Sequence, residues 1–231
     1  NGTSATTFSP DSTATRAQAA AMLVRIYEKL HRKNGWVHGF YANASYSQLS
    51  LTDYLDAVSV GWSRMTWDGG QARLATTSAG GNEYYIPTGY QEVAAYLADG
   101  RKRMHLNVYM DGTAPRELLA SSEGRAQAVE EIVNELTVSY RQLGRNPYSG
   151  VTVDFEGLRA ASRSDFTAFL EKLSREVHGL GKTLYVCVSP VLSSGPYYDG
   201  YDYRAIAALA DQVILMAYDY DARDLSGFEG T

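Results

Sequence analysis

The sequence predicts an α/β protein, a (β/α)8 TIM barrel that is truncated after strand six and preceded by an N-terminal helical segment. From residue 36 onward, six short apolar runs alternate with segments of helical periodicity. Such alternation is typical of parallel strands with helices outside them. A doubly wound sheet would also hold six units. A complete barrel takes about 250 residues, so we expect two further strand–helix units to be missing after Thr231.

Composition excludes several classes of protein. The 231 residues suffice for one large domain, or for a domain with a small module. A net charge of −5 argues against a nucleic-acid partner. The sequence contains no apolar run of about 18 residues, the length that a membrane span needs. Cys187 is the single cysteine, which excludes an intrachain disulfide and a CxxC metal site. The polar opening residues indicate a segment of a longer protein.

The N-terminal stretch carries a helix signal. Thr15 and Gln18 form a capping-box pattern before apolar residues at helical spacing, and Asn34-Gly35 ends the pattern. The stretch resembles the second half of an S-layer homology repeat, in which the matching positions are Phe8, Pro10, Thr15, Arg16, Ala17 and Arg25. The resemblance implies that residues 1–33 are a partial repeat, separate from a domain at 34–231. The resemblance also implies that, in the full protein, this segment contributes to binding a cell-wall polymer.

The six predicted strands and the helices between them follow in chain order. The strands are 36–42, 57–65, 103–110, 150–158, 183–191 and 212–220, and the helices are 88–100, 122–143, 164–177 and 202–210. Glycine-rich stretches at 68–81 and 193–202 follow strands two and five. In a barrel they are expected to form loops at the carboxyl ends of the strands, where active sites lie.

Strand four carries two acids in an apolar run. Because side chains alternate along a strand, Thr152, Asp154 and Glu156 share one face, which we expect to point into the barrel. Burial and like charge both raise a carboxyl pKa, so such a pair tends to keep one member protonated as a general acid. The alternatives are that both acids are exposed at a strand end, or that they pair with Arg159.

Strand six places a tyrosine at the same mouth. Ile214, Met216 and Tyr218 share a face, and Asp219 begins the following loop. Taken alone, a tyrosine on an apolar strand is more often a core residue than a site residue.

These segments together resemble glycoside hydrolase family 18, the chitinase-type barrels. That family carries D-x-x-D-x-D-x-E on strand four and M-x-Y-D on strand six. Asp154 and Glu156 match the last two acids of the first motif, and residues 216–219 match the second. Residues 39–41 resemble its G-[YF]-Y. Ser149 and Thr152 replace the first two acids, and 106–112 replaces S-x-G-G, as in the cell-wall and spore-cortex-lytic N-acetylglucosaminidase subgroup.

The resemblance implies an activity and a set of site residues. The activity is substrate-assisted, retaining cleavage of β-1,4 bonds after N-acetylglucosamine in peptidoglycan, without metal or cofactor. The alternatives are a chitinase and a non-catalytic glycan-binding barrel. The resemblance further implies a secreted, wall-associated bacterial protein, and the lack of a long apolar run predicts no membrane partner. The implied catalytic residues are Glu156, Asp154 and Tyr218, and the implied substrate-binding residues are Asp219, Met216, Phe40, Tyr41, Asn107 and Thr152. His38 is expected to serve packing.

Overall fold

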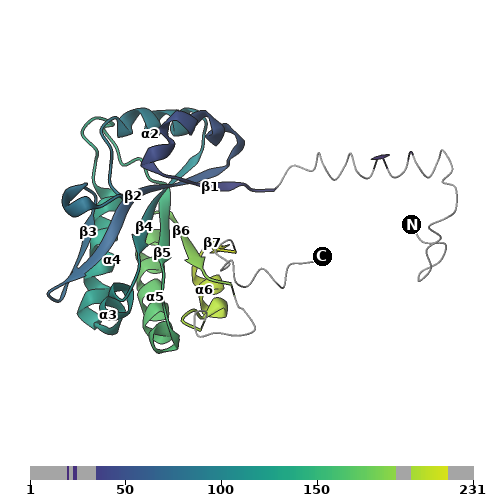
Figure 1. Ribbon diagram of the computed structural model, residues 1–231. Coiled ribbons are helices and arrows are strands. Elements are labelled where there is room, and N and C mark those ends of the chain that lie inside the picture. Colours follow the sequence, from purple (N-terminus) through teal and green to yellow (C-terminus); the bar gives the residue numbers. More distant parts are fainter. Residues whose placement is uncertain (1–19, 21–22, 25–34, 191–198, 218–231) are drawn as a thin grey trace. The chain divides into compact units, whose positions relative to one another are not determined.

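A computed structural model describes residues 35–190 and 199–217, with Ala20, Leu23 and Val24 (Figure 1). The chain divides into two compact units, Asn1–Trp36 and Val37–Thr231, and the fold below is that of the second. The N-terminal helix and the S-layer homology motif fall almost entirely outside the described residues. Both stay predictions, as does the domain boundary at residue 34.

The second unit is a mixed α/β fold built on one sheet. Six parallel strands lie in the order β1-β2-β4-β5-β6-β7, and β3 pairs antiparallel with β2. Strand–helix alternation therefore predicted the parallel sheet correctly. The strands are β1 (His38–Tyr41), β2 (Ala57–Asp68), β3 (Gln71–Ala75), β4 (Arg103–Met110), β5 (Gly150–Phe155), β6 (Thr183–Val188) and β7 (Gln212–Leu215). The helices are η1 (Asn43–Tyr54), η2 (Ala79–Gly81), α2 (Tyr90–Asp99), α3 (Ala114–Ala120), α4 (Ser122–Thr137), η3 (Ala160–Ser162), α5 (Arg163–Gly179) and α6 (Tyr203–Leu209).

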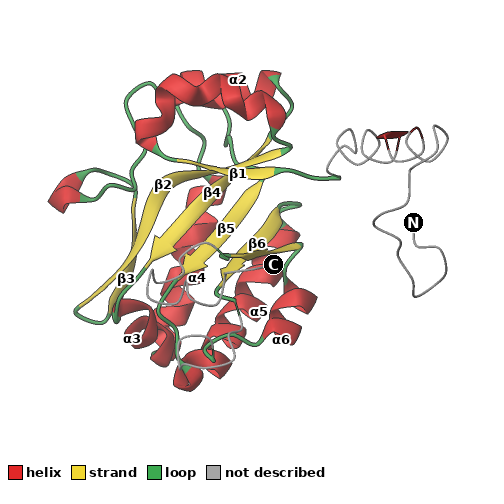
Figure 2. Ribbon diagram, turned by 45° about the vertical axis from the view of Figure 1, so that its right-hand side comes forward, coloured by secondary structure: helices red, strands yellow, loops and turns green. Residues whose placement is uncertain are grey.

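The hydrophobic core lies between the sheet and the helices that cover its outer face (Figure 2). Val151, Val153 and Phe155 of β5 point outward into this core and are fully buried. Phe155 stacks on Phe169 of α5 with ring centroids 5.4 Å apart. Burial of aromatic and branched side chains supplies most of the driving force for such a layer. The alternate residues of β5, including both acids of interest, are thereby left for the inner face.

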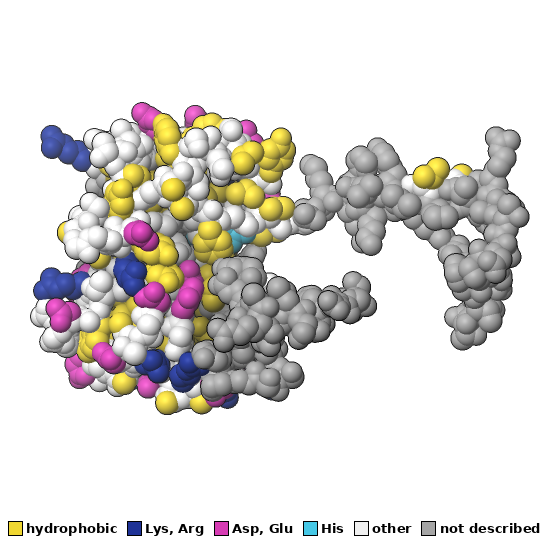
Figure 3. Space-filling view, viewed as in Figure 1, with side chains coloured by type: hydrophobic (Ala, Val, Ile, Leu, Met, Phe, Trp, Pro, Cys, Tyr) yellow, Lys and Arg dark blue, Asp and Glu magenta, His cyan; other side chains and the backbone are white. Residues whose placement is uncertain are grey.

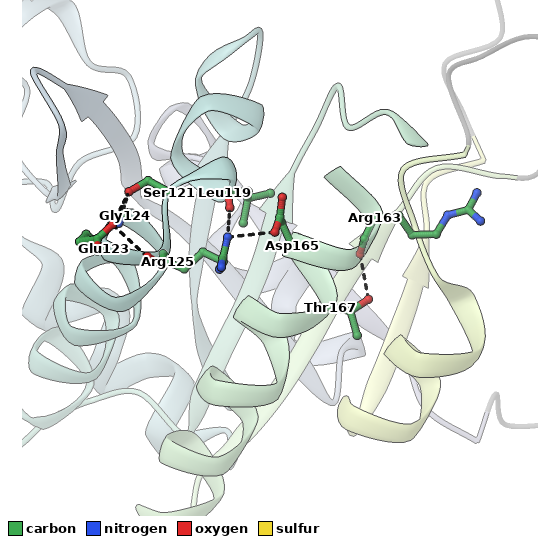
Figure 4. A network of polar contacts seen from close by, with 9 residues as sticks. Leu119, Ser121, Glu123, Gly124, Arg125, Arg163, Asp165 and Thr167 are labelled. Atoms are coloured by element: carbon green, nitrogen blue, oxygen red, sulfur yellow. Dashed lines mark hydrogen bonds and ion pairs between the residues drawn. The ribbon is translucent and has the colours of Figure 1, made fainter. Parts of the chain in front are cut away.

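Polar contacts hold α3, α4 and α5 together on the outer face (Figure 4). The Ser121 hydroxyl caps α4 by accepting a hydrogen bond from the Gly124 N–H at 3.0 Å. Arg125, one turn into α4, donates to the Leu119 carbonyl at the end of α3 and to the Asp165 carboxylate of α5. One guanidinium thus joins three α-helices.

The glycine-rich stretch at 68–81 is not only a loop, which corrects the prediction. Gly69 and Gly70 both have positive φ, and they form a tight turn that brings β3 back along β2, with Asp68 opposite Gln71. Glycine adopts this conformation without steric cost, so Asp-Gly-Gly between alternating apolar residues is a hairpin signal.

Several predicted boundaries also shift. The fourth strand ends at Phe155, so Glu156 follows it instead of lying within it, and the predicted helix 122–143 ends at Thr137. The short helix α3 and the 3-10 turns of η1 were not predicted. Within the described residues, no helix combines the length and apolar character needed to cross a membrane.

Candidate active site

The inner face of the sheet carries a row of polar side chains at the carboxyl ends of its central strands. Register pairs Arg64 of β2 with Tyr109 of β4, and Tyr109 with Asp154 of β5. Paired residues of neighbouring strands point to the same side. This row therefore places Asp154 beside β4. Asp154 and Glu156 both lie at the mouth that the carboxyl ends of the strands form.

The Asp154 side chain is buried in a polar setting. It is 9% exposed, and its Oδ2 accepts a weak hydrogen bond, 3.5 Å long, from the Asn107 amide. Its Oδ1 has no hydrogen-bond partner among the described residues, and neither does the Asn107 Oδ1. Burial raises the pKa of the Asp154 carboxyl, while the Asn107 amide and the Cys187 thiol act in the opposite direction. Two buried acceptors thus lack a donor, which is costly unless a ligand supplies one.

Glu156 lies one residue beyond β5 and is partly exposed. Its backbone N–H donates to the Met110 carbonyl at 2.8 Å, which fixes the chain at the end of β4. Burial is the largest cause that raises the pKa values of Tyr109 and Cys187, and the charge of Glu156 raises both pKa values further. The Glu156 carboxyl is therefore near inner-face groups while remaining reachable from solvent. This combination suits a group that exchanges protons with a bound molecule.

Beneath Asp154, hydroxyl and imidazole groups form a hydrogen-bonded chain across the floor. The Thr152 Oγ1 lies 2.6 Å from the Ser59 Oγ and 3.3 Å from the His105 Nδ1. The chain continues from Ser59 to the His38 Nε2 at 2.8 Å and from the His105 Nε2 to the Thr183 Oγ1 at 2.9 Å. His38 and His105 thus belong to a hydrogen-bonded polar floor. Packing was the role expected for His38, and packing alone does not describe these contacts.

The buried imidazole of His105 should make the fold sensitive to acid. Burial, with a smaller effect from the charge of His38, lowers the pKa of His105 to about 3. The group is neutral in the folded chain and protonates near pH 6.5 in the unfolded chain. Its contribution to stability is therefore complete above pH 6.5 and is lost as the pH falls toward 3.

Lowering the pH from 7 to 5 should cost about 2 kcal/mol of unfolding free energy through His105 alone. The check is urea unfolding at both pH values for the wild type and for His105→Gln, which removes the titration. The variant should lose about 2 kcal/mol less between these pH values. An equal loss in both proteins would show that His105 is not the group responsible.

Gly150, at the start of β5, is required by close packing on this floor. A Cβ at this position would lie 2.2 Å from the Thr183 carbonyl oxygen and 2.7 Å from the His105 ring. Neither the backbone of the paired strand nor the enclosed ring can retreat, so Gly150→Ala should destabilise the fold by about 3 kcal/mol. Thermal unfolding tests this, with Gly179→Ala as the control, because nothing lies within 4 Å of the added Cβ there. Equal melting temperatures for the two variants would contradict the packing argument.

The structure brings together some of the predicted site residues and separates others. Asp154, Glu156 and Asn107 meet at one mouth, with Thr152 below them on the floor. Phe40 is on the inner face, 49% exposed, opposite Ser59. Met216 is partly buried and continues the inner face of β7, since Ile214 pairs with Cys187.

Tyr41 points the other way. It is 5% exposed and belongs to the outer hydrophobic core, so β1 brings only Phe40 of that pair to the inner face. Tyr218 and Asp219 lie outside the described residues. Their assigned roles stay predictions, as does the role assigned to Tyr41.

Four residues at the mouth were not singled out in the sequence. Arg64 forms an ion pair with Asp111, and the Tyr109 hydroxyl donates to the same carboxylate at 3.0 Å. The Tyr84 and Tyr109 rings stack with centroids 4.3 Å apart. Tyr109 and Asp111 stand in the stretch 106–112, whose position at a predicted strand end was the available signal. Across the described ranges, no three His, Cys, Asp or Glu side chains group closely enough to hold a metal ion.

Comparison with known proteins points to glycosidases. No family model matches the chain. A 110-residue segment is 33% identical to "Putative sporulation-specific glycosylase YdhD" of Bacillus subtilis (strain 168), covering 44% of this chain and 26% of that protein. A 92-residue segment is 29% identical to "Cortical fragment-lytic enzyme" of the same organism, covering 38% of this chain and 21% of that protein. The chain thus spans about a quarter of the length of the curated relatives it matches.

The sheet also resembles a solved chitinase. The structure from Chromobacterium violaceum ATCC 12472 is 25% identical, with a TM-score of 0.64, over 80% of this chain and 56% of that chain. The fold is thus similar to that of chitinase-like barrels, and the chain is related to glycosidases. These findings support the coarser part of the family 18 resemblance and do not bear on the S-layer homology segment.

Proposed function

We propose that the protein is a retaining glycosidase that cleaves β-1,4 bonds after N-acetylglucosamine in bacterial peptidoglycan. The observation that carries the proposal is the unpartnered Oδ1 of Asp154, a buried acceptor placed two residues before the partly exposed Glu156. An acetamido N–H is a donor of the kind that this oxygen lacks. An acid beside it, reachable from solvent, is what bond cleavage then requires.

The proposed reaction uses the substrate as its own nucleophile. Glu156 gives its proton to the leaving glycosidic oxygen while the acetamido oxygen attacks the anomeric carbon, which yields an oxazolinium ion. Asp154 accepts the acetamido N–H and stabilises the positive charge. Glu156, now a carboxylate, takes a proton from water as the water oxygen attacks the anomeric carbon and the bond from that carbon to the acetamido oxygen breaks. This opens the oxazolinium ring, restores the acid and retains the anomeric configuration. Tyr218 is assigned to the acetamido carbonyl oxygen and Asp219 to the same sugar.

The names of the relatives support a wall glycan. "Cortical fragment-lytic" and "sporulation-specific glycosylase" both describe proteins that act in spore-forming bacteria, and the matched segments extend over 38% and 44% of this chain. The test is digestion of purified peptidoglycan by the full-length protein, followed by analysis of the new reducing ends. Reducing-end N-acetylglucosamine is expected, and reducing-end muramic acid or no release would contradict the proposal.

Chitin is the second candidate, favoured by the likeness to the solved chitinase. Chitin repeats the same β-1,4-linked N-acetylglucosamine. Comparing kcat/KM on chitotetraose and on peptidoglycan fragments separates the two candidates, and a strong preference for chitotetraose would favour chitin.

The place of action is proposed to be the bacterial cell surface, with residues 1–33 contributing to wall attachment. The motif from Phe8 to Arg25 supports this, since it resembles S-layer homology repeats, a family that binds anionic wall polymers. Sedimentation with purified cell walls, comparing the full-length protein with a variant lacking residues 1–33, tests it. Equal sedimentation of the two proteins would contradict the assignment.

A further inference from the structure

Arg64 reaches the inner face because β2 contains a bulge. Before the bulge Val60 pairs with Leu106, and after it Ser63 pairs with Val108, so β2 holds one extra residue there. Without that residue Arg64 would pair with Met110 and point into the outer core. The bulge instead sets Arg64 opposite Tyr109, on the side of Asp154. Bulges often re-aim a side chain in this way next to functional sites.

The Arg64 guanidinium is held in place but keeps free donors. Its Nη2 pairs with Asp111, and its Cζ lies 5.2 Å from the centre of the Tyr109 ring. Within the part of the chain that the structure describes, Nε and Nη1 donate no hydrogen bond, and the side chain is 34% exposed. The N–H groups of Nη1 can donate a charge-assisted hydrogen bond to a carboxylate oxygen while Nη2 stays with Asp111. An arginine fixed in this way loses little freedom when it binds an anion.

The same cluster borders the acid pair. Burial raises the pKa of Tyr84, the charges of Asp154 and Glu156 add to this, and Arg64 opposes it. Tyr84 is therefore within electrostatic reach of both acids and of Arg64. The loop that carries Tyr84 is built by Asn82, whose amide donates to the Tyr84 carbonyl at 2.6 Å and to the Thr77 carbonyl at 3.0 Å. On the face in Figure 3, basic, acidic and hydrophobic side chains are likewise interspersed.

We propose that Arg64 binds a carboxylate carried by the sugar next to the N-acetylglucosamine, with Tyr84 and Tyr109 as the aromatic wall of that subsite. The inference rests on the proposed function and names the substrate feature that the site reads. N-acetylmuramic acid carries such a group on its lactyl ether wherever no wall peptide is amide-linked to it, whereas chitin carries none. Sugars commonly pack on aromatic faces, and the tyrosine pair supplies one beside the cation.

The test compares a tetrasaccharide of alternating N-acetylglucosamine and N-acetylmuramic acid, the same compound with its lactyl carboxyls amidated, and chitotetraose. For the wild type, kcat/KM should fall about 10- to 100-fold on amidation, as expected for loss of a charge-assisted hydrogen bond. For Arg64→Gln, the preference for the anionic compound should disappear, and Arg64→Lys should keep part of it. Arg73→Gln is the control, because the Arg73 guanidinium donates to Gln71 on the exposed hairpin, away from the Arg64 cluster.

Three results would overturn the inference: no effect of amidation on the wild type, an unchanged preference in Arg64→Gln, or an equal loss on all three compounds. The last would show that Arg64 merely holds Asp111 in place. If Arg64→Gln does not fold, the amidation result and Arg64→Lys decide. If the wild type cleaves none of the compounds, the proposed function fails, and calorimetric binding of the anionic and amidated compounds to Glu156→Gln, with and without Arg64→Gln, decides the role of Arg64 separately.

Discussion

Replacing Glu156 with glutamine should lower turnover of the glycan substrate by about 10⁴-fold, at the upper end of what a general acid–base group contributes. Glutamine keeps the volume and hydrogen-bonding reach of the side chain but cannot release a proton. In the proposed reaction one carboxyl serves both the cleavage and the hydrolysis step, so both lose their proton carrier. The melting temperature should stay unchanged, because Glu156 is partly exposed and follows the strand.

The control for this variant is Glu171→Gln, an exposed glutamate on α5. It should leave both turnover and melting temperature as they are in the wild type. If Glu156→Gln retains more than about a tenth of wild-type turnover, Glu156 is not the proton donor.

Replacing Asp154 with asparagine should lower turnover by about 10²- to 10³-fold, the usual cost of losing one group that stabilises developing charge. Asparagine removes the negative charge beside the oxazolinium ion. It also removes one of the two oxygens available to the acetamido N–H. The residual rate should exceed that of Glu156→Gln, because the proton donor remains.

The same variant should be at least as stable as the wild type at neutral pH. Burial raises the pKa of the Asp154 carboxyl, so the folded chain holds this proton more tightly than the unfolded chain does. The resulting penalty on stability grows as the pH rises through the ordinary carboxyl range and is complete above the raised pKa. Asp154→Asn removes the penalty. Thermal unfolding at pH 7 beside Asp99→Asn, an exposed control, checks this, and a clear loss of stability confined to Asp154→Asn would contradict it.

Period-two alternation was enough to predict which face of β5 carries Thr152 and Asp154. Thr152, Asp154 and Glu156 were assigned to one face from sequence spacing alone, and β5 places Thr152 and Asp154 there, with valines and Phe155 on the other. The prediction worked because every position of a fully buried parallel strand is committed to one face. The extent of the strand was less predictable, since Glu156 keeps the backbone contact to Met110 after the ladder has ended.

Arg64 shows what sequence spacing could not reveal. Simple alternation through β2 puts residue 64 on the outer face, and only the extra residue between Val60 and Ser63 reverses this. A bulge depends on how two strands pair, which local sequence does not encode strongly. The loop that carries Tyr84 and the floor contacts of His105 likewise join residues far apart in the chain.

The anomeric configuration of the first product tests the central claim most directly, because it reports how the glycosidic bond of the substrate is broken. The full-length protein would be mixed with a soluble oligosaccharide that contains N-acetylglucosamine, from peptidoglycan or from chitin, whichever it cleaves faster. The new reducing end would be followed by proton NMR before mutarotation. Substrate-assisted catalysis predicts the β-anomer, formed with retention. An initial α-anomer, or no cleavage of either peptidoglycan or chitin oligosaccharides, would contradict the account.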